Sequence, residues 1–138
     1  MVTVNKTPEV LAIKSDKLEL SKVEAFIRRL FEMRNFPDDA FNKVLLCVSE
    51  AVINSIEHGN KNNRGKRVTI VAKCKRSSLK FLVKDEGDGF DPNLVLDPTS
   101  KENIKREGGR GIFIMKSICS RLRFGDNGKC VEIKIKLK

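Results

Sequence analysis

The spacing of apolar residues changes after residue 57 from helical recurrence to alternation, and this change constrains the fold more than any other feature of the sequence. Between residues 17 and 57 the apolar side chains recur at helical spacing, whereas over 68–84 and 131–137 they alternate with polar ones. Strict alternation is typical of a strand that buries one face and exposes the other. The sequence therefore predicts a helical first part followed by a sheet.

The helical part divides into two helices. The first is expected over about 17–33, capped by Ser15 or Asp16, and the second over about 38–57. Residues 58–60 end the second helix, because a glycine or an asparagine there can adopt a left-handed cap.

The remaining elements complete one two-layer domain. A third helix is expected at 111–120, after a long irregular stretch over about 90–110 that is typical of a lid or of a disordered segment. Five strands are predicted at 9–13, 68–74, 79–84, 122–124 and 131–137. Three helices are too few to cover both faces of such a sheet. We therefore expect a single α+β domain over 1–138, with a mixed, mostly antiparallel sheet of about five strands and about three helices on one face.

Composition excludes several classes of protein. No apolar run approaches the roughly 18 residues of a membrane span, and residues 1–6 lack the apolar core of a secretory signal, so the cytoplasm is the expected compartment. Four cysteines, none of them in a C-x-x-C pair, stand beside a single histidine, which argues against a structural zinc site. We expect Cys47, Cys74, Cys119 and Cys130 to be reduced core thiols.

The net charge of +10 favours anionic partners, which include nucleotide phosphates, acidic proteins and nucleic acids. The lysines are spread along strands and loops, and there is no Trp or Tyr on which a base could stack. We therefore expect no direct nucleic-acid contact. A basic nucleic-acid binder is kept as a separate hypothesis, and it requires a steeply salt-dependent affinity for DNA without ATP binding.

The second helix carries a polar row opposite its main apolar stripe. Glu50 and Asn54 lie one turn apart in this row, together with Glu57. Such a row can simply be the solvated face of an amphipathic helix. However, Asn is a poor residue for the middle of a helix, and apolar Leu46 and Ile53 flank the row, which indicates a partly covered cleft. There an amide oxygen could bind Mg²⁺ and a carboxylate could accept a proton.

Two glycine-rich segments follow the helices. Asp85 leaves a predicted strand and enters a turn with Gly87 and Gly89, which is either a surface turn or a pocket for a flat base. In a pocket, the Asp85 carboxylate could accept a hydrogen bond from the amino group of adenine. Residues 108–111 precede the third helix and are either a flexible hinge or an anion-binding loop of backbone N–H groups.

In this order the three segments resemble the motifs of the Bergerat-fold (GHKL-type) ATPases, most of all those of bacterial anti-sigma factor serine kinases. The matching residues are Glu50-x-x-x-Asn54 with His58-Gly59, Asp85-x-Gly87-x-Gly89-Phe-Asp-Pro92, and Gly109-Arg-Gly111-Ile-Phe-Ile-Met115. The combination is specific, although each motif alone is weak. The similarity extends over nearly the whole chain.

The resemblance implies both the chemistry and the partners. Carried over by position, Glu50 is the catalytic base, Asn54 binds Mg²⁺, Asp85 binds adenine, and Gly87 and Gly89 shape the pocket for the base. Gly109 and Gly111 approach the phosphates of ATP under the lid. No role is carried onto Arg106 or Arg110. Family members phosphorylate a serine on a small anti-sigma antagonist protein, bind a sigma factor, and often form dimers.

Two other functions share this pocket. Sensor histidine kinases carry a phospho-acceptor histidine on a separate helical domain, which this sequence does not contain, and His58 stands at a helix end. An ATP-gated module that sequesters a partner, with little kinase activity, is compatible with the same residues and is the alternative to a kinase.

Overall fold

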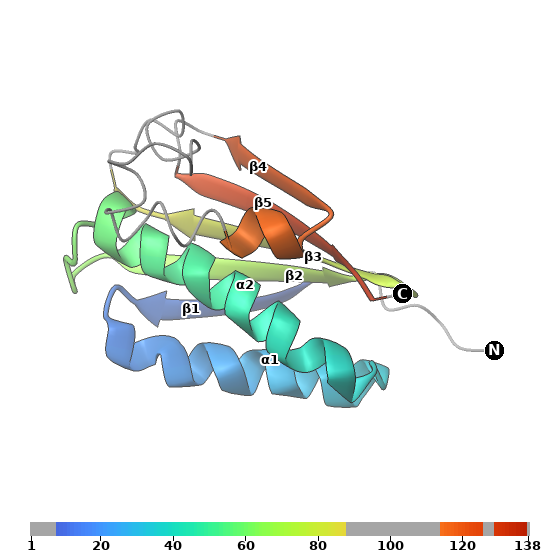
Figure 1. Ribbon diagram of the computed structural model, residues 1–138. Helices are drawn as coiled ribbons and strands as arrows, with labels where there is room; N and C mark the ends of the chain where they lie inside the picture. Colours follow the sequence, from blue (N-terminus) through green and yellow to red (C-terminus); the bar gives the residue numbers. More distant parts are fainter. Residues whose placement is uncertain (1–7, 88–113, 126–128, 138) are drawn as a thin grey trace.

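The computed structural model describes residues 8–87, 114–125 and 129–137, in which five strands form one sheet (Figure 1). The strands are β1 (Glu9–Lys14), β2 (Arg67–Cys74), β3 (Ser78–Asp85), β4 (Arg121–Gly125) and β5 (Cys130–Lys136). Their order across the sheet is β1-β2-β3-β5-β4, and each described pair is antiparallel. The predicted two-layer α+β sandwich is confirmed, and its described strands are all antiparallel, in place of the mixed, mostly antiparallel sheet expected from the sequence.

Helices cover one face of this sheet (Figure 1). The described helices are η1 (Lys17–Glu19), α1 (Leu20–Arg34), η2 (Asp38–Ala40), α2 (Phe41–Asn54) and η3 (Ser55–Gly59), and residues 114–118 are also helical. Asp16 caps the first of them, because its side chain accepts a hydrogen bond from the Leu18 N–H. Asn35 ends α1 in the left-handed conformation, as expected of a chain that stops before a proline.

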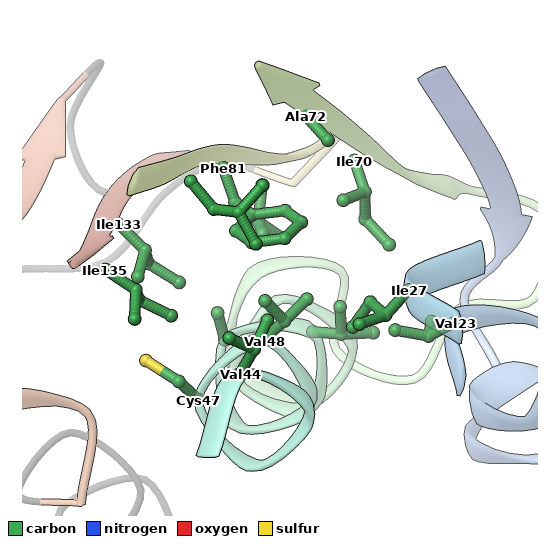
Figure 2. Close-up of a cluster of buried hydrophobic side chains, with 14 of the residues drawn as sticks. Val23, Ile27, Val44, Cys47, Val48, Ile70, Ala72, Phe81, Ile133 and Ile135 are labelled. Carbon is green, nitrogen blue, oxygen red and sulfur yellow. The ribbon is translucent and has the colours of Figure 1, made fainter. Parts of the chain in front are cut away.

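The core lies between the helices and the sheet. Figure 2 shows Val44 and Val48 of α2 and Ile27 of α1 directed at side chains of the strands, among them Phe81 and Ile133. All five side chains are fully buried. Removing such side chains from water stabilises the fold by about 1.5–3 kcal/mol each, so this layer holds α2 in place on the sheet.

The second helix ends differently from the prediction. Its last turn, η3, is a π-helix, and Asn60 behind it keeps a right-handed conformation, so the left-handed cap expected at Gly59 or Asn60 is wrong. The left-handed residues are Lys61 (φ 53°) and Asn62 (φ 59°). The π-turn extends the helix to residue 60, because the Asn60 N–H still donates a hydrogen bond to the Ser55 carbonyl at 2.8 Å. The chain therefore turns back only after residue 60.

None of the four cysteines forms a disulfide, and only Cys47 is fully buried, while Cys74, Cys119 and Cys130 are half-buried. The described helices include none that is long and apolar enough to cross a membrane.

Candidate functional site

The polar row of α2 is covered at its C-terminal end and open at its N-terminal end. Asn54 is only 5% exposed, and Glu50, one turn earlier, is half-buried. Leu46, which was expected to lie under cover, is 43% exposed. Glu57 is taken up in an ion pair with Lys17 of η1. The row is therefore a solvated face near Leu46 and a sheltered one at Asn54, which narrows the candidate site to Glu50 and Asn54.

One polar atom of the buried Asn54 side chain is left without a partner. Its Nδ2 atom has no hydrogen-bond partner among the described residues. Burying an N–H donor without a partner is costly, so this atom indicates a place where a ligand could supply an acceptor. The π-turn that begins directly after Asn54 fits this interpretation, since π-bulges occur frequently at functional sites.

The end of α2 meets the end of β3 at two glycines (Figure 1). A methyl group built on Gly87 would lie 1.7 Å from the Gly59 carbonyl oxygen, and one on Gly59 would lie 2.3 Å from Asp85 Oδ2. No other residue permits this approach without moving the backbone or the carboxylate. The first two motifs, separated by about 30 residues in the chain, are therefore in direct contact, as the nucleotide-pocket interpretation requires.

The Asp85 carboxylate is held in one orientation. The Gly87 N–H donates a hydrogen bond to Asp85 Oδ1 at 2.9 Å, and the Asp85 N–H donates to the Lys129 carbonyl at 2.9 Å. The first bond closes an Asx-turn at the end of the strand, and the second ties Asp85 to the residue before β5. An acceptor fixed in this way beside a glycine surface is suited to the amino group of a flat base.

Asn60 is a residue of the site that sequence reasoning missed. It is 1% exposed, and its Oδ1 accepts a hydrogen bond from the Glu86 N–H at 2.9 Å while its Nδ2 donates to the Arg67 carbonyl at 3.0 Å. Glu86 in turn accepts from the Arg67 N–H. Asn60 thus connects the helix end to the turn that follows Asp85. The signal in the sequence was the position of Asn60 directly after Gly59, but Asn60 was interpreted there as a helix cap.

Two thiols lie together behind the site. Cys47, one turn before Glu50, donates a hydrogen bond to Cys119, which follows the helical residues 114–118. This bond lowers the pKa of Cys119 to about 7, against the effect of its partial burial. The same bond, and secondly burial, raises the pKa of the Cys47 thiol. Two residues expected to be inert core thiols therefore form a polarised pair.

The third motif cannot be compared with the structure. Gly89, Gly109 and Gly111, with Arg106 and Arg110, lie outside the described residues, so their placement stays a prediction. Within 8–87, 114–125 and 129–137, no group of three or more His, Cys, Asp and Glu side chains could bind a metal. The residue that fits Mg²⁺ is the buried Asn54, through its amide oxygen Oδ1, because this ion takes oxygen ligands, uses few from the protein and retains waters and phosphate oxygens.

Known proteins resemble the chain in sequence and in fold. A family model described as the histidine kinase-like ATPase domain matches residues 13–135. The anti-sigma F factor of Shouchella clausii is 35% identical over 104 residues, which are 73% of this chain and 68% of that protein. The serine-protein kinase RsbW of Staphylococcus aureus is 30% identical over 106 residues, 72% of this chain and 67% of that protein.

A solved structure shares the fold at low identity. It is the crystal structure of the RsbU and RsbW domains of Rv1364c from Mycobacterium tuberculosis, with a TM-score of 0.64 and 14% identity. The match covers 94% of this chain and 32% of the larger one. The architecture that positions the site is therefore one that known proteins also adopt.

Proposed function

Because the chain belongs to the histidine kinase-like ATPase family, we propose that it is an ATP-dependent serine kinase of the anti-sigma factor type. The observation that carries this proposal is the contact between Gly59 at the end of α2 and the turn of Asp85 and Gly87 after β3. This contact supports the proposal because it sets the Asp85 carboxylate, the proposed acceptor for the base, beside the end of the helix that carries Glu50 and Asn54. The similarity to an anti-sigma factor and to a serine-protein kinase supports this assignment.

The substrate in this proposal is a serine on a small antagonist protein, and a sigma factor or similar regulator is the second partner. The names of the relatives are the support for these partners. An ATP-gated module that binds its partner without phosphorylating it would use the same pocket, so phosphoryl transfer has to be measured directly.

The proposed mechanism divides the work between the two elements. Asp85, held by the Gly87 N–H, accepts a hydrogen bond from the adenine amino group, and the two glycines let the helix end and the turn approach closely enough to hold the carboxylate there. Asn54 would hold Mg²⁺ through its amide oxygen, and the ion would supply positive charge that neutralises the phosphates. Glu50, one turn before Asn54, accepts the proton of the attacking serine hydroxyl. On sequence grounds alone, Gly89 completes the base pocket, and Gly109 and Gly111 surround the phosphates.

The test is to separate ATP binding from phosphoryl transfer. Glu50→Ala should lower turnover of labelled ATP onto a candidate antagonist protein by about 10²–10⁴-fold while ATP still binds. Asp85→Asn should weaken ATP binding itself by about tenfold, which corresponds to the loss of one charged hydrogen bond. Glu24→Ala and Asp39→Asn, on exposed positions of the helical layer, are the matched controls and should alter neither.

Each result bears on a separate part of the proposal. Unchanged phosphorylation in Glu50→Ala removes that residue from the base role, and unchanged affinity in Asp85→Asn removes the adenine assignment. ATP binding without any transfer by the unmodified chain would replace the kinase with the binding module.

A further inference from the structure

The face of the sheet opposite the helices is a separate surface of the molecule (Figure 1). The strand register places every second residue on it, here called the open face. Its members are Val10, Ala12, Lys14, Arg67, Thr69, Val71, Lys73, Ser78, Lys80, Leu82, Lys84, Arg121, Arg123, Gly125, Cys130, Glu132, Lys134 and Lys136. The helices and the site of Asn54 and Asp85 lie on the other side of the sheet, so a molecule bound to the open face leaves that site accessible.

The charge of the open face has one sign. Nine of its residues are basic and only Glu132 is acidic, counted over the strands that the structure describes. Four of the basic residues stand directly opposite one another in a single row across β2, β3, β5 and β4: Lys73, Lys80, Lys134 and Arg121. Glu132 reaches one of them, Lys80, at 3.6 Å. Like charges directly opposite each other weaken a sheet, so this row works against the stability of the fold.

Solubility alone does not require this arrangement. An exposed sheet is protected equally well by mixed charges, which avoid the repulsion. A row of cations that repel one another becomes favourable when an anionic partner binds to it. The arrangement therefore indicates a binding surface rather than a solvated face.

An apolar strip runs beside the basic row. Val10, Val71 and Leu82 are paired with one another across β1, β2 and β3 in register. Val10 is 58% exposed, and the other two are half-buried between the longer side chains of Lys73, Lys80 and Lys84. Phosphate groups gain nothing from contact with such a strip, whereas apolar side chains of a protein can bind it.

We propose that the open face binds an acidic, amphipathic protein segment, whose carboxylates pair with the basic row while its apolar side chains contact Val10, Val71 and Leu82. A second copy packed through the same face is disfavoured as the occupant, because it would bring basic residues against basic residues. Single-stranded nucleic acid lacks a stacking partner here, since no aromatic residue lies on the open face. A membrane surface is disfavoured, because Val10 is the one residue of the apolar strip that is exposed.

Binding to four probes tests the proposal. The probes are a synthetic helical peptide of Glu and Leu, a polyglutamate peptide of equal charge, a short DNA duplex, and vesicles containing phosphatidylserine. The Glu/Leu peptide should bind at least about tenfold more tightly than polyglutamate, and added salt should weaken its binding. In the ¹⁵N-labelled protein, the amide signals of Val71, Leu82 and Lys134 should shift, whereas those of Asn54 should not.

Paired variants assign the contribution of each part of the face. Lys73→Glu combined with Lys134→Glu should lower the affinity for the Glu/Leu peptide by at least about tenfold. The matched control, Arg29→Glu combined with Lys43→Glu, makes the same change of net charge on the helical layer and should have little effect. Val10→Thr combined with Val71→Thr keeps the side-chain shape. This double variant should lower the affinity for the Glu/Leu peptide but not the affinity for polyglutamate.

Three results would overturn the inference. The first is tighter binding of the DNA duplex or of the vesicles than of the Glu/Leu peptide, which would assign the face to nucleic acid or to a membrane. The second is a loss of affinity in the helical-layer control equal to that of the open-face variant, which would show that net charge alone causes the effect. The third is no binding of the peptide at all. Because none of these measurements involves ATP, each result is independent of the proposed kinase activity.

Discussion

At the scale of single residues, Asn60 has more influence on the site than its place in the sequence suggests. Its side chain satisfies one backbone N–H and one backbone carbonyl that belong to two other elements. An asparagine that is buried and fully paired holds its neighbours in a single geometry, because any rearrangement leaves a polar group unpaired. Asp85 owes its position beside the helix end in part to this residue.

Replacing Asn60 with Ala should lower the free energy of unfolding by about 2 kcal/mol, because two backbone groups lose their partner. Urea denaturation measures this change, and a titration with ATP should show weaker binding at the same time. Asn63→Ala is the matched control: its side chain also accepts one backbone hydrogen bond, from Gly65 at 2.9 Å, but at an exposed position. That variant should cost under about 1 kcal/mol. Equal losses in the two variants would contradict the role given to Asn60.

Cys119 is predicted to be more reactive than Cys47 and Cys74 near neutral pH. Its pKa is lowered to about 7 by the hydrogen bond from Cys47, so its thiolate forms above about pH 7 and is lost as the pH falls below it. Burial instead raises the pKa of Cys74, although Arg34 opposes this shift. Glu50 and Lys43 act with opposite sign on Cys47, the donor of the pair. Iodoacetamide should therefore modify Cys119 first at pH 7.

Mass spectrometry of the tryptic peptide 117–121 follows this reaction across the pH range. In Cys47→Ala the donor is absent, so the midpoint for alkylation of Cys119 should move up toward the ordinary value of about 8.5. A midpoint near that value already in the unmodified chain would refute the polarised pair.

At the scale of elements, the contact between the end of α2 and the end of β3 decides whether there is a pocket. The two elements are far apart in sequence, and they touch through the bare backbone of Gly59 and Gly87. A side chain on either glycine has nowhere to go, since backbone atoms or the Asp85 carboxylate occupy its place. The glycines of the first two motifs thus serve the packing of elements as well as any approach by a ligand.

Gly87→Ala should destabilise the protein by about 2–3 kcal/mol, because its methyl group would lie 1.7 Å from the Gly59 carbonyl oxygen. Urea denaturation provides the measurement. Gly125→Ala is the control, since a methyl group there meets nothing within 4 Å, and its effect should stay within about 1 kcal/mol. If the two variants are equally stable, the two elements do not approach each other as closely as described.

At the scale of the whole molecule, the sheet separates two surfaces for which different partners are proposed. The helical side carries the proposed ATP site, and the open face carries most of the basic charge of the strands. A ligand that binds only the folded chain stabilises all of it, because the helices and the sheet share one core. Nucleotide binding should therefore be visible in global unfolding.

Mg-ATP at about 100 times its dissociation constant should raise the melting temperature by about 10 °C. Differential scanning calorimetry measures this shift, and Asp85→Asn at the same nucleotide concentration is the control, in which the shift should be smaller. Adding EDTA tests the metal, because removal of Mg²⁺ should reduce the shift in the unmodified chain. If Mg-ATP does not raise the melting temperature, the chain does not bind the nucleotide as proposed.

The sequence by itself determined the elements and the side of each that faces the core. The alternation in β5 and the helical spacing in α1 depend only on neighbours within a few residues, so they are readable without the fold. The glycines and acids of the first two motifs were recognisable for the same reason, although the conformation of Asn60 was not, since the π-turn before it has no local signature.

Only the tertiary structure decided which distant residues meet. Strand register pairs Lys80 with Lys134 and Lys134 with Arg121, and helix packing brings Cys47 to Cys119 and Gly59 to Asp85. Spacing along the chain carries no information about such pairs, because a shift in register by two residues preserves every alternation while changing every neighbour. The lysines that looked dispersed in the sequence are for this reason gathered on one face in the fold.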